Sequence, residues 1–248
     1  MQHTNFGLLR ASFSHMKPTL TVSDRHKFVY VKNRKSGCST IQLALCRAEL
    51  DDPNFFSDHI HQDSHRILKT GKHVKFHDLI RLSLVPKFFV FTFVRNPYSR
   101  FLSAYLSKIS RPQKQKAEVL IALGKDATDL KQHVSFEEFV ELVASQAPRE
   151  MNPHWAPQTT YLLPHLIRYD FIGRFETFEA DMKLVLEKLK YSNIELTHFR
   201  KTGASYKLDD YYNERTKEIV RQIYKDDFIA FNYGTEMLPS PGLGSHRA

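Results

Sequence analysis

A run of seven residues, Phe88–Val94, places the strongest constraint on how this chain of 248 residues can fold. Every residue in the run is apolar except Thr92, and phenylalanine and valine make up the rest, as is typical of a β-strand. An unbroken apolar run, without alternation of polar and apolar residues, indicates a parallel strand that is covered on both faces. We therefore predict a central strand here, with helices packed on the sheet that contains it.

Further strand and helix patterns alternate along the chain. Short β-rich segments predict strands at Phe28–Val31 and Phe171–Phe175. Helices are predicted at 41–50, from Pro97 onwards, from the capping box Ser135–Glu138 to Ala144, from Thr177 to Leu189, and at 211–223. This alternation predicts an α/β fold with three layers, in which a central, mainly parallel sheet is flanked by helices.

Four segments lack a clear pattern of this kind. Residues 1–25 are expected to be a leader or an antiparallel edge element, and 51–72 a long polar loop or irregular segment. Residues 111–133 are expected to be an exposed, partly helical insertion, and the tail 239–248 is predicted to be disordered. With 42% hydrophobic residues the chain can bury a sizeable core, so 1–238 is predicted to be a single domain, which can divide into two lobes.

Charge and cysteine content narrow the class of partner and compartment. The net charge of +9 favours anionic partners such as nucleotides, acidic glycans, nucleic acid or anionic lipid, without choosing among them. Cys38 and Cys46 would lie about 12 Å apart on one helix, so both are predicted to be free thiols of a reducing compartment. Without a secretory pattern or an apolar stretch of membrane-spanning length, we expect a soluble, cytoplasmic protein, unless an N-terminal anchor has been removed.

Histidine and cysteine positions do not predict a metal site. No Cys/His cluster has the spacing of zinc ligands. His59, His61 and His65 are close in sequence, but no ligand motif surrounds them. We interpret these three as residues of a surface loop.

The segment Lys35–Thr40, with the sequence KSGCST, joins the first predicted strand to the next helix. Small and hydroxyl-bearing residues at such a turn leave backbone N–H groups available to an anion, and the helix adds its positive N-terminal end. Lys35 supplies a full positive charge. The segment is not a Walker A loop, because its lysine precedes the small residues. The pattern therefore predicts a phosphate site of another kind.

A second pattern follows the central strand. Arg95 comes directly after the run, and Ser103 follows eight residues later on the predicted helix. Ligands of open α/β sheets bind at the carboxyl ends of strands, and a guanidinium with a hydroxyl suits a phosphate monoester. Two such sites at neighbouring strand ends predict a ligand with two separated phosphates. The alternative is that Arg95 and Arg100 pair with local carboxylates.

Together these motifs resemble the sulfotransferases that use 3′-phosphoadenosine 5′-phosphosulfate (PAPS), especially the Golgi-type carbohydrate branch and its bacterial relatives. The Lys35–Thr40 segment is similar to the loop that binds the 5′-phosphosulfate, and Arg95 with Ser103 to the 3′-phosphate site. The segment Tyr169–Glu176 resembles the family's strand and turn. The resemblance covers roughly residues 27–190. It implies a P-loop-like fold and transfer of a sulfuryl group to a hydroxyl of a carbohydrate or glycolipid, with no metal.

The resemblance also implies roles for individual residues. Lys35 would neutralise charge on the bridging oxygen as the nucleotide leaves. The 5′-phosphate would be held by Ser36, Gly37, Cys38, Ser39 and Thr40. Arg200 and Lys201 would touch the 3′-phosphate, unless the segment 198–206 is a plain surface loop. The Gly-x-x-Gly-x-Trp-Lys form of the cytosolic subfamily is absent, which argues against a phenol or steroid acceptor.

An acceptor hydroxyl needs a general base. His73 is the first candidate, because Gly71–Phe76 resembles the segment that supplies the base histidine in uronosyl 2-O-sulfotransferases. His77, His154 and Glu176 are the alternatives, and none of the histidines need have this role.

Two other functions compete with a sulfotransferase. A P-loop-type nucleotide kinase would need a lysine after a glycine-rich loop and an acidic magnesium ligand, and neither is evident. A non-catalytic basic module that binds glycan or nucleic acid would interleave aromatic and basic side chains, whereas the lysine-rich segment 111–133 has no aromatic residue. We therefore expect no nucleic-acid partner. Nothing in the pattern indicates an oligomeric state.

Overall fold

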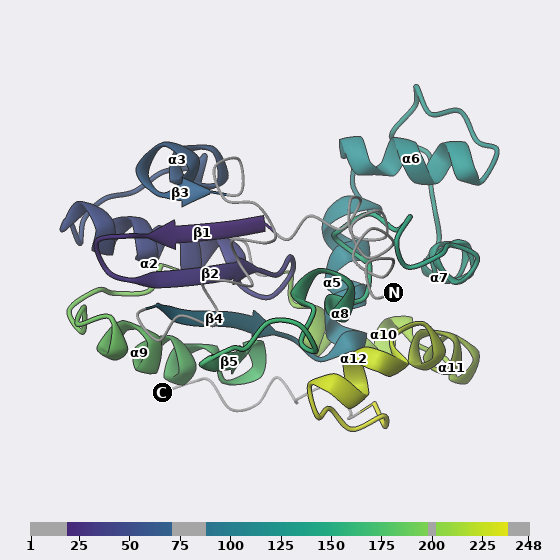
Figure 1. The fold of residues 1–248 in the computed structure, drawn as a ribbon. Helices are drawn as coiled ribbons and strands as arrows, with labels where there is room; N and C mark the ends of the chain where they lie inside the picture. Colours follow the sequence, from purple (N-terminus) through teal and green to yellow (C-terminus); the bar gives the residue numbers. More distant parts are fainter. Residues whose placement is uncertain (1–18, 71–87, 198–201, 238–248) are drawn as a thin grey trace, which may run out of the picture. The chain divides into compact units, whose positions relative to one another are not determined.

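The computed structural model describes residues 19–70, 88–197 and 202–237 (Figure 1). The described residues fall into two compact units. The first unit contains 19–70, 88–94 and 158–197, and the second contains 95–157 and 202–237. A single domain over 1–238 stays a prediction, and the tail 239–248 lies outside the described residues.

The first unit is built on one five-stranded sheet with the order β3-β1-β2-β4-β5. The strands are β1 (Thr19–Ser23), β2 (Phe28–Lys32), β3 (Lys69–Thr70), β4 (Phe89–Val94) and β5 (Phe171–Arg174). β4 pairs in parallel with both β2 and β5, whereas β1 is antiparallel to its neighbours β2 and β3. The predicted α/β fold with a mainly parallel sheet is therefore confirmed, and the Phe88–Val94 run forms an inner strand. β1 is antiparallel as predicted, but it is not an edge strand because β3 lies outside it.

Both faces of the inner strands are buried. On one face Tyr30 stacks on Phe91, and this cluster packs against the helices α2 (Cys38–Leu50) and α9 (Phe178–Lys188). On the other face Val29, Val31 and Val90 are fully buried as well. Burial on both sides is the reason why these strands are continuous apolar runs rather than alternating ones.

Residues 51–72 are not a loop throughout, so this prediction was wrong. They contain the helix α3 (Ile60–Ile67) and the short strand β3. α3 is mostly polar, and only Ile60 and Ser64 of it are buried, so a hydrophobic pattern does not reveal it. Ser64 accepts a hydrogen bond from the side chain of Gln42 on α2, which fixes α3 beside that helix.

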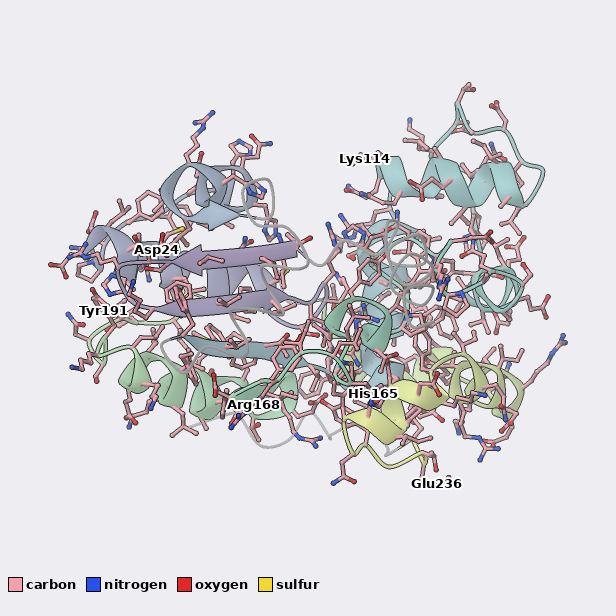
Figure 2. All side chains as sticks on the ribbon, in the orientation of Figure 1. Asp24, Lys114, His165, Arg168, Tyr191 and Glu236 are labelled. Atoms are coloured by element: carbon pink, nitrogen blue, oxygen red, sulfur yellow. The ribbon has the colours of Figure 1, made fainter. Side chains whose placement is uncertain are left out.

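Two short helices and an aromatic contact complete the first unit. The short helices are α8 (Gln158–Leu162) and the 3₁₀ turn η1 (Phe175–Thr177). After α9, the hydroxyl of Tyr191 lies 3.2 Å from Nε2 of His26. His26 belongs to the turn between β1 and β2, which also carries Asp24, and Figure 2 labels Asp24 and Tyr191 at the same end of the sheet. The two rings meet edge to face, which ties the end of α9 to the sheet.

The second unit is helical (Figure 1). Its elements are α5 (Pro97–Lys108), α6 (Lys114–Ala122), α7 (Phe136–Ala144), η2 (Ala204–Tyr206), α10 (Leu208–Tyr211), α11 (Glu214–Ile223) and α12 (Lys225–Ala230). Aromatic side chains form its core: Phe101 of α5 stacks on Phe139 of α7, and Phe139 packs edge to face on Trp155. All three are buried.

Local capping signals located several of these helices correctly. The capping box of Ser135 and Glu138 is present at the start of α7, and Asn96 caps α5 ahead of Pro97. The predicted last helix, 211–223, was wrong in its bounds. The helix α10 ends at Tyr211, and α11 begins at Glu214, because the side chain of Asn213 accepts a hydrogen bond from Thr216 N and caps a new helix. The helix α12 follows α11.

The predicted insertion 111–133 is partly helical but not wholly exposed. Val119 and Leu120 of α6 are buried, and so are the polar residues Gln115 and Lys116. Over the described ranges of both units, no helix is long and apolar enough to cross a membrane.

Candidate functional site

The chain turns sharply between β2 and α2. Lys35 and Gly37 both have left-handed backbone angles, with φ of 71° and 80°. Gly37 is the N-cap of α2, and its carbonyl accepts the first helical hydrogen bond from Ile41 N at 3.1 Å. Glycine has no side chain with which to cap the amides of the first turn, so they point outward together with the positive end of the helix dipole. This is the backbone geometry of an anion site.

A buried amide holds the turn in place. Nδ2 of Asn33 lies 3.1 Å from Ser36 Oγ, 2.9 Å from the carbonyl oxygen of Phe93 and 2.6 Å from Oε1 of Gln158. Asn33 is 3% exposed, and Ser36 and Gln158 are fully buried. The start of the turn is thereby tied to the end of β4 and to α8. The Ser36 hydroxyl thus has a structural partner within the turn.

The remaining residues of the predicted loop open α2. Cys38 and Ser39 are half-buried, and Thr40 is buried in the first turn. Both cysteines are free thiols, as predicted, and burial raises the pKa of the Cys46 thiol to about 12. No acidic residue stands in the first turn of α2, which suits a site for negative charge.

A histidine that we had interpreted as a loop residue contacts this turn. His61, on the exposed side of α3, has its Nε2 atom 3.0 Å from the Ser39 hydroxyl. Its Nδ1 atom lies 3.0 Å from Nζ of Lys32 and also contacts Oε1 of Gln42. Lys32 is 8% exposed, and burial lowers the pKa of its ammonium group.

Arg95, in the second unit, directly follows the end of β4 and is 4% exposed. Its Nε donates a hydrogen bond to Ser99 Oγ at 2.9 Å, and its Nη2 donates to Ser205 Oγ at 3.1 Å. Ser103 is buried one helical turn beyond Ser99, and its hydroxyl lies 3.1 Å from that of Thr202. Ser99 and Ser103 lie four residues apart on α5 and therefore share one face of it, and Arg95 contacts this face through Ser99.

Arg100 has a different environment. It is 1% exposed, and its Nη1 donates to the carbonyl oxygen of Ala156 at 2.8 Å, with that of Pro153 at 3.5 Å from Nη2. These bonds anchor the backbone around Trp155. Arg100 is therefore a structural residue of the second unit rather than a surface charge.

The structure brings Lys35, Ser36, Gly37, Cys38, Ser39 and Thr40 together in the first unit, and Arg95 with Ser103 in the second. The predicted base residues His73 and His77 and the predicted phosphate contacts Arg200 and Lys201 lie outside the described residues. His154 is half-buried, with its Nδ1 atom 2.8 Å from Oδ1 of Asn152, and Glu176 is exposed in η1. Within the described ranges, no group of three metal-ligating side chains occurs.

Sequence reasoning missed the neutral partners of these charged residues. Ser205 contacts Arg95 and Thr202 contacts Ser103, whereas the sequence pattern indicated the nearby cations Arg200 and Lys201 of the same segment. The signal was present in Thr202-Gly203-Ala204-Ser205, a small-residue stretch in which Gly203 adopts φ 68°. Asn33 and His61 carried no comparable local signal.

Comparison with known proteins assigns the chain to a family. The model of a family described as the sulfotransferase family matches residues 18–234. The chain therefore belongs to the sulfotransferase family.

The relatives are carbohydrate sulfotransferases. Human carbohydrate sulfotransferase 9 is 29% identical over 252 residues, which cover 90% of this chain and 55% of the relative. Zebrafish (Danio rerio) carbohydrate sulfotransferase 14 is 30% identical over 206 residues, 76% of this chain and 53% of the relative. Mouse carbohydrate sulfotransferase 8 is 26% identical over 244 residues, 86% of this chain and 55% of the relative. The chain spans about half the length of these relatives. No solved structure matches it.

The comparisons correct one prediction. A cytoplasmic location was expected from the free thiols and from the lack of a secretory pattern. This prediction was wrong, because the relatives are carbohydrate sulfotransferases, which are the Golgi-type branch that the motifs resemble.

Proposed function

We propose that this protein is a sulfotransferase that moves the sulfuryl group of PAPS to a hydroxyl of a carbohydrate or glycolipid acceptor. The observation that carries the proposal is the left-handed turn at Lys35 and Gly37 before α2, in a chain of the sulfotransferase family. The names of the relatives support a carbohydrate as acceptor.

The 5′ end of the donor is assigned to the first unit. Backbone amides of the first turn of α2 and the hydroxyls of Ser39 and Thr40 bind the 5′-phosphate. Lys35 neutralises the charge that develops on the bridging oxygen. Ser36 and Gly37 shape the turn, and Cys38 lines it. The half-buried position of Ser39 and the absence of acidic residues from the first turn support this assignment.

The 3′-phosphate is assigned to Arg95 and Ser103 of the second unit. The guanidinium of Arg95 is already oriented by two hydroxyls, those of Ser99 and Ser205, so it loses little freedom when it binds a phosphate. Arg200 and Lys201 add positive charge in the same stretch of sequence. Preorganised donors of this kind recognise a phosphate monoester through charge-assisted hydrogen bonds.

The reaction is an in-line displacement at sulfur. The acceptor oxygen forms a bond to sulfur as the bond from sulfur to the bridging oxygen of the 5′-phosphate breaks. The electron pair of that bond leaves with adenosine 3′,5′-bisphosphate, and the acceptor proton passes to a general base, for which we propose His73. Such transfers resemble phosphoryl transfer, in which positioning and charge stabilisation supply most of the catalysis.

Ligand-dependent melting tests the donor. Adenosine 3′,5′-bisphosphate without magnesium should raise the melting temperature, since a ligand present at 100 times its Kd stabilises the folded state by about 2.7 kcal/mol. ATP with magnesium should have a smaller effect. The opposite ranking would favour a kinase, and stabilisation by sulfated glycans alone would favour a glycan-binding module.

Transfer itself is measured with PAPS labelled in its sulfuryl group and a panel of carbohydrate and glycolipid acceptors. Labelled product supports the proposal. Tight binding of the bisphosphate without any labelled product across the panel would argue against an enzyme of this acceptor class. In the same assay His73→Ala should lose turnover and keep bisphosphate binding, and unchanged turnover would remove His73 as the base.

A further inference from the structure

Lys32 is a buried lysine at the end of β2, just before the predicted donor loop. It is 8% exposed. Alternate residues of a strand point to the same side, so Lys32 shares its side of β2 with Phe28 and Tyr30, which both belong to the hydrophobic core. Lysine is almost never so deeply buried unless a negative group pairs with it. The surroundings of its ammonium group therefore need an explanation.

A negative partner for Lys32 is missing from the described residues. Among them, its ammonium group forms no ion pair, and its hydrogen-bond partner is Nδ1 of His61 at 3.0 Å. An imidazole ring is neutral or positively charged whichever nitrogen carries the proton, so it cannot balance an ammonium charge. The other ionisable groups that act on Lys32 are those of Cys38 and Arg34, and neither is a carboxylate.

The cost of this arrangement falls on the charged form of the lysine. Burial lowers the pKa of the Lys32 ammonium group, Cys38 raises it and Arg34 lowers it. A buried charge without a partner of opposite sign is strongly destabilising. Lys32 is therefore expected to reduce the stability of the protein alone, and a bound anion would relieve this cost.

The ammonium group of Lys32 lies close to the place proposed for such an anion. Nζ contacts one nitrogen of the His61 ring, and the other ring nitrogen is 3.0 Å from the hydroxyl of Ser39. One small ring thus separates the ammonium group from a hydroxyl that we propose binds the 5′-phosphate. The first turn of α2 has no side-chain cap and no acidic residue. A phosphate bound at this turn would supply the negative charge that Lys32 needs.

We infer that Lys32 is a further donor-binding residue, whose buried charge is balanced by the 5′-phosphate when the donor binds. This inference rests on the proposed function. It adds a second lysine to a site for which the sequence pattern indicated Lys35.

Thermal melting of Lys32→Met tests the inference through stability. Methionine has a similar shape but no charge, so the melting temperature without nucleotide should rise by at least about 3 °C, because an unbalanced charge is no longer buried. A lysine that only supports the fold would give the opposite sign. Lys183→Met is the matched control, since the Lys183 side chain is 77% exposed, and it should melt as the wild type does.

Calorimetric titration with two nucleotides tests the inference through binding. Lys32→Met should weaken binding of adenosine 3′,5′-bisphosphate by about tenfold or more, the usual cost of a lost contact with a charged group. Binding of adenosine 3′-monophosphate, which lacks the 5′-phosphate, should not change. Lys183→Met should bind both nucleotides as the wild type does.

The two measurements can each overturn the inference. A melting temperature of Lys32→Met that does not rise, or a variant that does not fold, would show that the charge of Lys32 is already balanced within the protein. Unchanged bisphosphate affinity, or equal weakening of both nucleotides, would place Lys32 away from the 5′-phosphate. A wild type that binds no bisphosphate would overturn the proposed function and this inference with it.

Discussion

The glycine that starts α2 lies against the ring of a phenylalanine that starts α9. A Cβ atom on Gly37 would lie 2.4 Å from Cε2 of Phe178, far inside van der Waals contact. The same glycine has φ of 80°, which side chains other than glycine rarely adopt. Backbone angle and packing therefore both require glycine at the point where the predicted donor loop becomes a helix.

Gly37→Ala should lower the free energy of unfolding by about 2–4 kcal/mol and abolish measurable binding of adenosine 3′,5′-bisphosphate. Gly124→Ala is the matched control, because Gly124 has φ of 68° but no atom within 4 Å of the added Cβ. It should cost only about 1–2 kcal/mol and leave binding intact. Urea denaturation measures the free energy of unfolding, and calorimetry measures binding. Equal losses of unfolding free energy in the two variants would show that the contact with Phe178 does not contribute to the cost at Gly37.

Lys35→Ala should lower sulfuryl transfer by at least about 100-fold, because the charge on the leaving oxygen is no longer neutralised. The side chain of Lys35 is half-buried, so the melting temperature should stay close to that of the wild type. Lys183→Ala, whose side chain is 77% exposed on α9, controls for the loss of one positive charge. Labelled-sulfate transfer measures both variants, and turnover retained in Lys35→Ala would remove this lysine from the mechanism.

The two thiols should differ in their rates of reaction with a maleimide. Cys46 is fully buried, and burial raises its pKa to about 12, so it should react only on unfolding. Cys38 is half-buried in the first turn of α2 and should react in the native protein. Bisphosphate should slow the labelling of Cys38, as mass spectrometry of the labelled peptides will show. Labelling of Cys38 at the same rate with and without nucleotide would contradict its place in the donor site.

Arg95→Lys should reduce the preference for adenosine 3′,5′-bisphosphate over adenosine 5′-monophosphate by about tenfold, because an ammonium group cannot form the two-pronged contact of a guanidinium. Arg215→Lys is the control, since the Arg215 side chain is 76% exposed and pairs with Glu141. The ratio of the two dissociation constants, measured by calorimetry, reports on the 3′-phosphate alone. An unchanged ratio in Arg95→Lys would assign the 3′-phosphate to other residues.

Local patterns predicted the elements that local interactions determine. β4, the start of α5 at Pro97 and the capping box of α7 all follow from side chains within a few residues of one another. The sequence pattern did not predict α3, because the stability of this helix depends on packing against α2 through Ile60 and Ser64 and not on a periodic apolar face. For the same reason the histidines of 59–65 were interpreted as loop residues.

Local sequence patterns account for the mainly parallel sheet, the turn that begins at Lys35 and the presence of Arg95 at the end of β4, because strand pattern, glycine and helix caps act over short distances. Long-range packing, in contrast, sets which neutral groups contact these charged residues. Ser39 and His61 are 22 residues apart, Ser103 and Thr202 are 99 apart, and Arg95 and Ser205 are 110 apart. Such contacts form when packed elements bring distant segments together, and no local propensity encodes them.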